Sequence, residues 1–367
     1  MTAVGDATWS VGQTVTMRAV VFDSFGVTPA VQQVPDLRPL PDAVVVEVEA
    51  TGLCRSDWHG WVGHDRDIAL PHVPGHEFVG RITATGEQVR RLRTGQRIIT
   101  PFVCGCGTCS QCTSGNAQVC PHQTQPGFTH WGSFAEQVVV RHADFNAIVV
   151  TDDLNPLALV GLGCRFATAF RGLRQRAAVQ PGERVAVFGA GGVGLSAVMI
   201  ASALGAEVIA VDVAQQALEL ARAAGAAHVV RAGQPDDATG AGDQAPAELA
   251  EQVRALGPVH VSVEALGLAE TASAAVLSLA PRGRHVQIGL FPTEPVLPVG
   301  RIIAEEITFL GSHGMAAAQY RPMVDLIDAG TLRPETLVTR QIGLAQAAEA
   351  LSTMADQHHP GMTVIVP

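Results

Sequence analysis

The stretch RVAVFGAGGVGLSAVMIASALGAEVIAVDV, residues 184–213, decides the fold. The apolar runs at its two ends are typical of buried β-strands, and the glycine-rich turn between them opens an apolar helix. Strand, turn, helix and strand form a βαβ unit, whose two strands run parallel. The sequence therefore predicts an α/β fold that includes a parallel sheet covered by helices.

The glycines of this turn form the pattern G-x-G-x-x-G. Glycine-rich turns are common, but this one follows a strand and opens a helix, a context that favours a dinucleotide site. Its glycines let the backbone approach a pyrophosphate held at the positive end of the helix. The second strand ends in an acid, which accepts hydrogen bonds from ribose hydroxyls and repels the 2′-phosphate of NADP. The predicted cofactor is NAD, and the predicted binding residues are Gly189, Gly191, Gly192, Val193, Gly194 and Asp212.

The regions on either side of residues 184–213 predict further elements. Downstream, helix and strand patterns continue to alternate in ALELARAAGAAHVV, VHVSVEAL and GRHVQIGL, and a polar surface insertion is expected in RAGQPDDATGAGDQAP. Before residue 150, short runs such as AVVVEVEA and FAEQVVVR indicate a compact β-rich unit, preceded by an irregular segment over residues 1–16. After residue 310 we expect amphipathic helices in YRPMVDLIDAG and LAQAAEALSTMA, and a closing strand in MTVIVP.

The composition limits the classes of function. A chain of 367 residues with 47% hydrophobic and 16% charged residues is expected to form two globular domains. Its net charge of −10 disfavours nucleic acid as a partner, and no apolar run is long enough to predict a membrane span. The chain contains no lysine, which excludes catalysis through a lysine Schiff base. Because the N-terminus lacks the pattern of a secretory signal, we expect a cytoplasmic protein.

Five of the seven cysteines lie between residues 104 and 120. Four of them follow C-x2-C-x2-C-x7-C, a spacing that suits four thiolates around a structural zinc ion. In a reducing compartment such a cluster is more often a metal site than a set of disulfides. Cys104 falls outside the spacing and is expected to be a free thiol. The predicted ligands are Cys106, Cys109, Cys112 and Cys120.

A second candidate metal site involves GLCRSDWHGWVGHDRDIALPHVPGHEF, residues 52–78. A catalytic zinc needs about three protein ligands and one open position. Cys54 and His76 are candidates, and Cys164 in GLGCRFATAF is the remaining cysteine that could join them. Taken singly, such residues are more often core cysteines or solvated histidines, so these positions alone leave the ligand set open.

From Met17 onward the sequence closely resembles the zinc-containing medium-chain alcohol dehydrogenases. The resemblance rests on motifs in the order of that family, namely GLCRSDWH, PGHEFVG, the four-cysteine spacing, GLGCRFATAF and VFGAGGVGLSA. It implies a GroES-like β-rich catalytic domain over residues 1–158, rejoined by residues 311–367. It also implies a doubly wound parallel-sheet Rossmann domain for NAD over residues 159–310. Two zinc ions per subunit are expected, a structural ion in the cysteine cluster and a catalytic ion held by Cys54, His76 and Cys164.

The resemblance also implies roles for residues around the catalytic ion. Asp57 orients the ligating histidine, a contact that raises the basicity of the ligand. Glu77, next to His76, lies close to the metal. Ser56 takes the proton of the alcohol, which then leaves through the nicotinamide ribose and His59.

Four positions bear on the cofactor. By resemblance Arg55 contacts the pyrophosphate and Thr168 lies near the nicotinamide. Met362 stands where many relatives have Lys or Arg at the cofactor phosphate, and Ala217 where some have a lysine at the adenosine ribose. Cofactor contacts are therefore expected to be weaker than in those relatives, unless Arg55 suffices.

The expected reaction interconverts a small-molecule alcohol and its aldehyde or ketone, with hydride transfer to NAD. Cys164 favours this branch over the polyol dehydrogenases, which generally have Glu as the third ligand. A polyol, sugar or amino-cyclitol is the alternative substrate class. A non-catalytic zinc- and nucleotide-binding relative is a third interpretation, which Ser56 and His59 disfavour because binding needs no proton relay.

Several features receive weaker predictions. Trp58, Trp61 and Phe102 are candidate walls of the substrate pocket, although such aromatic residues are more often simple packing. No role is predicted for His64 or His72. The short connection between Cys120 and Cys164 resembles that of tetrameric bacterial relatives, so we expect a homotetramer rather than a dimer.

Overall fold

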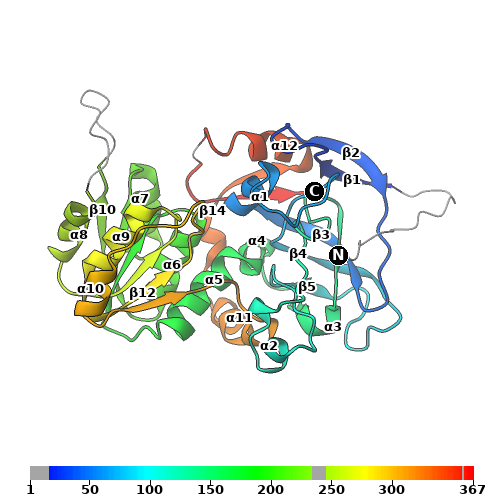
Figure 1. Cartoon of the computed structure of the whole chain (residues 1–367). Coiled ribbons are helices and arrows are strands. Elements are labelled where there is room, and N and C mark those ends of the chain that lie inside the picture. Colours follow the sequence, from blue (N-terminus) through cyan, green and yellow to red (C-terminus); the bar gives the residue numbers. More distant parts are fainter. Residues whose placement is uncertain (1–15, 234–244, 358) are drawn as a thin grey trace.

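The computed structural model describes residues 16–233, 245–357 and 359–367. These residues form two lobes, each built around a β-sheet (Figure 1). Of the predicted irregular segment 1–16 only Thr16 is described, and it begins the first strand. Most of the predicted insertion over residues 231–246 lies outside the described residues.

The first lobe contains a seven-stranded sheet in the order β14-β15-β3-β4-β5-β7, with β6 paired to β3 off this path. Its central strand β3 is valine-rich and almost fully buried, as expected for a strand covered on both faces. A separate antiparallel pair is formed by β1 (Thr16–Val21) and β2 (Ala30–Pro35). The strands of the larger sheet are β3 (Val44–Leu53), β4 (Phe78–Thr85), β5 (Arg97–Ile99), β6 (Gln137–Val140), β7 (Ile148–Val149), β14 (Val338–Gly343) and β15 (Met362–Val366).

The C-terminal segment returns to this first lobe. Strand β15 pairs antiparallel with β3, where Thr363 lies opposite Leu53 and Ile365 opposite Thr51, and β14 pairs parallel with β15. In Figure 1 the red C-terminal strand accordingly lies beside the blue strand β3. The closing strand predicted in MTVIVP is therefore present, and it completes a sheet that begins more than 300 residues earlier.

The second lobe contains a six-stranded sheet in the order β10-β9-β8-β11-β12-β13, in which every pair is parallel. The strand order reverses beside β8, the strand that precedes the glycine turn. Ligands of such sheets bind at the carboxyl ends of the strands at this reversal. The strands are β8 (Arg184–Phe188), β9 (Glu207–Asp212), β10 (His228–Arg231), β11 (Val259–Glu264), β12 (Leu279–Gln287) and β13 (Thr308–Gly311).

The helices of the second lobe include the one opened by the glycine turn. This helix is apolar along its length and buries most of its residues, because it packs against both the parallel sheet and α5. The predicted βαβ unit is thus present. The helices are α6 (Gly192–Ala203), α7 (Gln215–Ala223), α8 (Pro246–Arg254), α9 (Ala269–Ser278) and α10 (Val299–Ala304).

The remaining helices belong to the first lobe and to the connection between the lobes. They are α1 (Arg55–Trp61), α2 (Ser110–Thr113), α3 (Ala143–Asn146), α4 (Pro156–Leu159), α5 (Arg165–Arg171), α11 (Arg321–Asp328) and α12 (Leu344–Ser352). Short helical turns lie at Ala117–Val119, Val160–Gly163, Gly172–Arg176, Ala317–Gln319 and Pro334–Leu337. The two amphipathic helices predicted after residue 310 correspond to α11 and α12.

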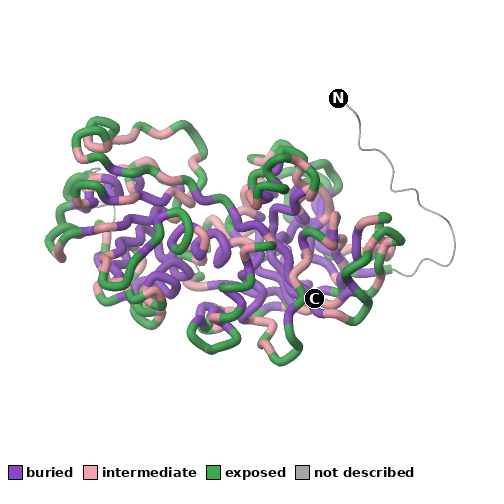
Figure 2. Tube along the Cα trace, turned by 90° about the horizontal axis from the view of Figure 1, so that it is seen from below, coloured by how far each residue is buried: buried purple, intermediate pink, exposed green. Residues whose placement is uncertain are grey.

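One apolar core crosses the junction between the lobes. It runs from Val79 and Ile99 of the first sheet, through Phe166 and Phe170 of α5, to Val185 of the second sheet. Figure 2 shows the resulting buried interior as continuous purple segments through the middle of the molecule. Helix α5 is therefore fixed between the two sheets, and so is the residue that precedes it, Cys164.

The predicted domain boundaries fall inside elements of the structure. The boundary at 158/159 lies within α4, and the boundary at 310/311 lies within β13. All six strands of the parallel sheet lie between Arg184 and Gly311. The exact limits of the two domains stay a prediction.

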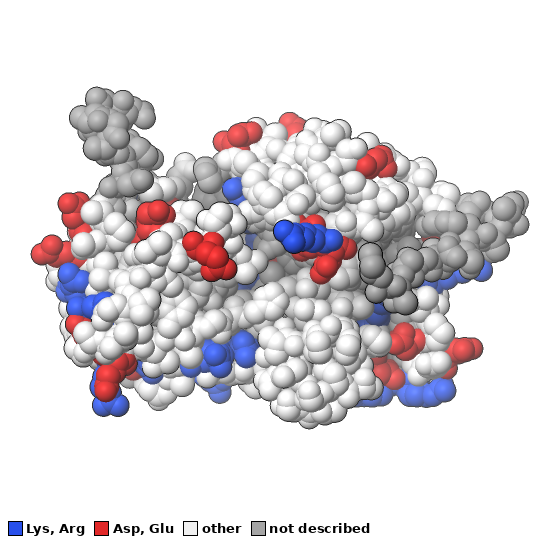
Figure 3. Space-filling model, in the orientation of Figure 1, with Lys and Arg blue, Asp and Glu red and all other residues white. Residues whose placement is uncertain are grey.

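On the face shown in Figure 3, acidic and basic side chains are interspersed, without a continuous basic area. No helix among the described residues is both long and apolar enough to cross a lipid bilayer.

Candidate active site

Three candidate metal ligands from distant parts of the chain meet in the structure. Cys54 lies between β3 and α1, His76 in the loop before β4, and Cys164 at the start of α5. Their ligand atoms, two Sγ atoms and a ring nitrogen of His76, lie within 4.8 Å of one another. Folding thus brings together the three residues whose spacing in the sequence left the ligand set open.

Asp57 fixes the orientation of His76. Its Oδ1 accepts hydrogen bonds from His76 Nδ1 at 2.8 Å and from Gly75 N at 3.1 Å, and its Oδ2 accepts one from Cys54 N at 2.9 Å. The other ring nitrogen of His76, Nε2, is buried and has no hydrogen-bond partner among the described residues. Such a nitrogen is costly to bury unless a ligand uses its lone pair.

The donor set fits a catalytic zinc ion. Two thiol sulfurs and one histidine nitrogen are three protein ligands of the kind that zinc prefers, and they leave a fourth position open. The hydrogen bond between the two thiols holds the pKa of Cys54 well below its ordinary value and that of Cys164 well above it, and His76 lowers the pKa of Cys54 further. Since zinc binds the thiolate, this environment favours the ligating form of Cys54.

Glu77, the residue after His76, is fully buried and forms an ion pair with Arg165, the residue after Cys164. The backbone amide of Arg165 also donates a hydrogen bond to Glu77 Oε2 at 3.3 Å. Glu77 is thus buried between the residues that follow two of the candidate ligands, and its place beside a bound metal stays a prediction. Its partner Arg165 was not predicted, because the two residues stand 88 positions apart.

The two predicted relay residues lie on α1, directly after Cys54. Ser56 Oγ lies 3.8 Å from Cys54 Sγ, and His59 follows one turn later. The Nδ1 atoms of His59 and His64 lie 2.9 Å apart, a distance at which one ring must donate and the other accept. Burial is the main cause that lowers the pKa of His59, and the charges of His64 and Arg55 lower it further. His64, for which no role was predicted, thus lies at the outer end of the predicted relay.

Aromatic rings flank His76. The ring centroid of Phe102 lies 6.0 Å from that of His76, and the ring centroid of Phe128 lies 5.1 Å from it. Trp61 is instead a core residue whose Nε1 donates to Val27 O at 2.7 Å. Phe102 thus lies beside a candidate metal ligand, and its role as a pocket wall stays a prediction. Trp61 packs inside the lobe. Phe128 was missed because GFTHWG carries no distinctive spacing.

The glycine turn has the shape of a phosphate cradle. A Cβ on Gly194 would lie 1.7 Å from the carbonyl oxygen of Gly189, so only glycine lets α6 begin this close to the turn. A Cβ on Gly191, the N-cap of α6, would meet no protein atom within 4 Å. The first N–H groups of a helix, here including those of Gly192 and Val193, lack partners within the helix. Open space and free donors therefore coincide at the positive end of α6.

Asp212 lies at the end of β9, as predicted. Its carboxylate accepts hydrogen bonds from Ala190 N at 2.6 Å and from Ala214 N at 2.9 Å. The first of these bonds ties the second strand to the glycine turn. Ala217 lies buried on α7 and offers no charge at this position.

The other predicted cofactor residues have different surroundings. Arg55 is exposed, its guanidinium stacks over Trp58 at 4.3 Å from the ring centroid, and its Nη1 donates to Met354 O at 3.3 Å. Thr168 uses its hydroxyl within α5, where it donates to Cys164 O at 2.7 Å. Met362 is buried in the apolar core. No hydrogen bond of Arg55 with the glycine turn is found among the described residues.

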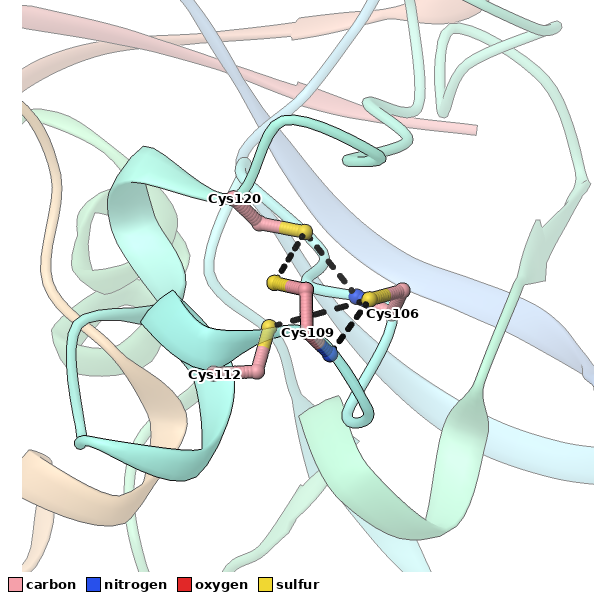
Figure 4. A group of neighbouring side chains, drawn as sticks. All are labelled: Cys106, Cys109, Cys112 and Cys120. Carbon is pink, nitrogen blue, oxygen red and sulfur yellow. Dashed lines mark hydrogen bonds between the residues drawn. The ribbon is translucent and has the colours of Figure 1, made fainter.

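The four clustered cysteines converge around a common centre (Figure 4). Cys106 Sγ lies 4.0 Å from Cys112 Sγ, and Cys109 Sγ lies 3.6 Å from Cys120 Sγ. A tetrahedral zinc site with Zn–S bonds of about 2.3 Å requires sulfurs about 3.8 Å apart. Backbone amides donate to two of these sulfurs, from Cys109 to Cys106 Sγ and from Cys106 to Cys120 Sγ. The cluster therefore fits the structural zinc ion that its spacing predicts.

Two residues without a predicted role are core residues. Cys104 is fully buried, and burial raises the pKa of its thiol to about 11, so it stays protonated near neutral pH. His72 is 1% exposed and packs edge-on against Phe22, with ring centroids 5.5 Å apart. Neither side chain belongs to a metal cluster found among the described residues.

Comparison with protein families gives two matches. Residues 40–150 match the model of the alcohol dehydrogenase GroES-like domain, and residues 192–329 match that of the zinc-binding dehydrogenases. The first match covers most of the seven-stranded sheet and the cysteine cluster. The second covers the helix opened by the glycine turn and most of the parallel sheet.

Individual relatives agree with these matches. An NAD-dependent alcohol dehydrogenase of Sulfurisphaera tokodaii is 30% identical over 362 residues, which cover 96% of this chain and 100% of the relative. A sorbitol dehydrogenase of Halalkalibacterium halodurans is 28% identical over 323 residues, 86% of this chain and 90% of the relative. A solved protein of Sinorhizobium meliloti 1021, assigned as a zinc-binding dehydrogenase and bound to NADP, is 27% identical with a TM-score of 0.82, covering 96% of this chain and 100% of that one.

Proposed function

The chain belongs to the zinc-containing alcohol dehydrogenases of the medium-chain dehydrogenase/reductase superfamily, and from this we propose that it interconverts a small-molecule alcohol and its aldehyde or ketone with NAD(H). One observation carries the proposal. The buried His76, whose Nε2 has no partner among the described residues, offers a ring nitrogen within 4.8 Å of two thiol sulfurs, on the chain that also carries an open glycine cradle.

Cys54, His76 and Cys164 would hold the catalytic metal, and the glycine turn would hold the dinucleotide. A zinc ion bound there supplies a Lewis acid that lowers the pKa of the substrate hydroxyl, and a bound nicotinamide supplies the hydride acceptor. Asp57 keeps Nδ1 of His76 protonated, so that Nε2 presents its lone pair to the metal.

The remaining steps belong to side chains of this chain. Ser56 lies beside Cys54 and accepts the proton of the alcohol by hydrogen bond. His59 lies one turn further along α1, is half-buried, and carries the proton towards solvent. Its Nδ1 contacts Nδ1 of the exposed His64. Phe102 and Phe128 flank the ligating histidine and exclude water from the reacting centre.

Asp212 supports NAD rather than NADP as the preferred cofactor. Its carboxylate ends β9, and the residues that follow, Val213 and Ala214, offer no cation for a 2′-phosphate. The NADP-bound structural relative makes this preference worth measuring directly. An enzyme that turns over equally well with NADP and NAD would contradict it.

The experiment for the proposed function is a panel of alcohols assayed by the near-ultraviolet absorbance of NADH. We expect NAD reduction by the zinc-loaded enzyme and loss of activity after chelation, with recovery when zinc is restored. Zinc-loaded protein that oxidises no member of the panel and reduces no aldehyde or ketone contradicts the proposal. It would favour the non-catalytic zinc- and nucleotide-binding interpretation.

A polyol is the second candidate substrate class, because a sorbitol dehydrogenase is among the relatives. Cys164 as the third ligand candidate favours a simple alcohol, as the family resemblance implies. Including sorbitol and other polyols, sugars and amino-cyclitols in the panel separates the two classes. A much higher kcat/KM for a polyol would assign the enzyme to the second class.

We also propose a homotetramer in the cytoplasm. Helix α10 buries none of its residues, and nearby apolar side chains are strongly exposed, with Val296 at 87%, Ile303 at 73% and Leu290 at 71%. Strongly exposed apolar side chains like these in a single chain are typical of a subunit interface. All seven cysteines are free thiols, which suits a reducing compartment.

A further inference from the structure

Arg165 is a buried cation that the predicted cofactor residues do not include. It is the first residue of α5, directly after Cys164, and is 5% exposed. Its Nη2 forms the ion pair with Glu77, whereas its buried Nε has no hydrogen-bond partner among the described residues. A buried guanidinium normally uses most of its five N–H donors. Arg165 therefore has donors left for a ligand.

The side chain of Arg165 reaches the glycine turn. A Cβ on Gly192, the first residue of α6, would lie 2.7 Å from Arg165 Cδ and 2.8 Å from its Nη1. Gly191, the preceding residue, faces space without any protein atom within 4 Å of a Cβ. The guanidinium thus lies against the positive end of a 12-residue helix, where the phosphate cradle is open.

The other end of the same side chain lies at the metal ligands. A Cβ on Gly52, in β3, would lie 2.7 Å from Arg165 Nη2 and 2.3 Å from Glu77 Oε1. Glu77 follows His76, and Arg165 follows Cys164. Arg165 therefore spans the distance from the cofactor cradle to the residue beside the ligating histidine.

The remaining candidate residues do not supply this charge. The chain contains no lysine, Met362 is apolar and buried, and Arg55 is exposed and stacked over Trp58. A guanidinium with unused donors beside an open helix N-terminus is suited to bind phosphate oxygens through charge-assisted hydrogen bonds.

We propose that Arg165 binds the pyrophosphate of the nicotinamide cofactor and links it to Glu77. The proposal rests on the proposed NAD(H)-dependent function. Nη1, the nitrogen nearest to Gly192, donates to a phosphate oxygen, and Nη2 keeps its ion pair with Glu77. Phosphate and carboxylate then share one guanidinium, so the charge of Glu77 weakens the hold of Arg165 on the cofactor.

Substitutions of the two members of this ion pair are therefore expected to have opposite effects on NADH binding. Arg165→Gln removes the cation and is expected to weaken NADH binding about tenfold to a hundredfold. Glu77→Gln leaves Arg165 without a competing carboxylate, so NADH binding stays equal or becomes tighter. A purely structural ion pair predicts instead that both changes disturb the site in the same direction.

The test measures dissociation constants of the zinc-loaded full chain by titration calorimetry, with NADH and with adenosine, which has no phosphate. Arg165→Gln is expected to change the adenosine constant by less than about twofold, because the adenosine half of the cradle is untouched. Arg174→Gln, an exposed arginine shortly after α5, is the matched control and should bind NADH as the wild type does.

A second variant guards against misfolding, because Arg165→Gln leaves a buried carboxylate unpaired. The double change of Arg165→Met with Glu77→Gln removes both charges and should show the same loss of NADH affinity. Wild-type NADH affinity in either Arg165 variant overturns the proposal, and so does equal weakening of NADH and adenosine. If the wild-type chain binds neither NADH nor NADPH, the proposed function fails as well, whereas unchanged binding in the variants overturns only the role of Arg165.

Discussion

Both carboxylate oxygens of Asp57 are used inside the candidate metal site. One accepts from the ring of His76 and the other from the backbone of Cys54, so a single side chain positions two of the three ligands. The residue is 1% exposed, and water cannot replace these contacts. The affinity of the site for zinc should therefore depend on a residue that does not touch the ion.

Asp57→Asn is the prediction that follows. An amide presents a weaker acceptor to His76 Nδ1, which loosens the ring and lowers the basicity of Nε2. We expect zinc affinity to fall about 10–100-fold, measured by competition with a chromophoric chelator. Asp67→Asn, in the exposed loop that follows α1, should leave zinc affinity unchanged. Equal zinc affinity in both variants would remove Asp57 from this role.

The contact between His59 and His64 predicts a shift in the pH profile. During alcohol oxidation the neutral form of His59 accepts the proton, so activity is lost as the pH falls through its pKa. His64 lowers the pKa of His59, after burial and together with Arg55, whereas Cys54 raises it. His64→Gln removes one lowering influence, so the pKa of His59 rises and the acidic limb of kcat/KM moves to higher pH. An acidic limb that stays in place, or moves equally in the exposed control His122→Gln, contradicts this role.

At the scale of elements, the segment that carries the four clustered cysteines, residues 106–120, has almost no core apart from its thiols. Helix α2 has four residues, and the buried cluster consists of cysteines with Ala117 and Ala316. Segments this short are not stable by themselves. A metal ion, rather than apolar packing, is therefore expected to hold this lobe together.

Cys109→Ser tests this dependence on metal. We expect zinc content to fall from about two ions to about one per chain, since a closed site loses its ion with one ligand. A loss of ~2 kcal/mol corresponds to a decrease in Tm of ~4–8 °C for a domain of this size. Cys104→Ala is the matched control, because Cys104 lies in a different apolar cluster and should keep both ions. Unchanged zinc content in Cys109→Ser would refute the structural site.

Two glycines of the glycine turn are expected to have different roles, Gly194 in packing and Gly191 in cofactor binding. Gly194→Ala places a Cβ 1.7 Å from Gly189 O and should destabilise the whole second lobe, seen as a lower Tm. Gly191→Ala meets no protein atom within 4 Å and should keep the wild-type Tm, yet weaken NADH binding because its methyl group enters the cradle. If Gly191→Ala binds NADH normally, the open space at this position is not where the pyrophosphate lies.

At the scale of the whole molecule, the features predicted from the sequence are those whose signals lie within a short stretch of the chain. The β8–α6–β9 unit and the four-cysteine lobe were correct because their signals, glycine spacing and short cysteine intervals, are local. The catalytic ligand set needed the family resemblance, since its members lie in three separate loops. The contacts of Arg165 with Glu77 and of His59 with His64 could not be predicted, because they depend on how two segments approach each other and where each side chain points.

The proposed assembly makes a prediction at this scale. Light scattering should give about four times the chain mass of 38.3 kDa. Ile303→Glu places a charge in the exposed apolar patch of α10 and should lower the measured mass. Val27→Glu, at an exposed apolar residue of the first lobe, should not. A wild-type protein that scatters as a monomer would contradict the assembly.

The return of β15 to β3 has a consequence for how the protein is made. Beside β4, the last part of β3, Thr51–Leu53, acquires its partner on the other edge only when residues 363–365 have been synthesised. At about 5–20 residues per second, the intervening chain of roughly 310 residues takes about 15–60 s to emerge. During that interval the strand that leads into Cys54 carries an unpaired edge, which is prone to misassociation. In the nascent chain the parallel sheet can therefore form before β15 has been synthesised. During this interval the candidate metal site lacks the strand that supports it on that edge.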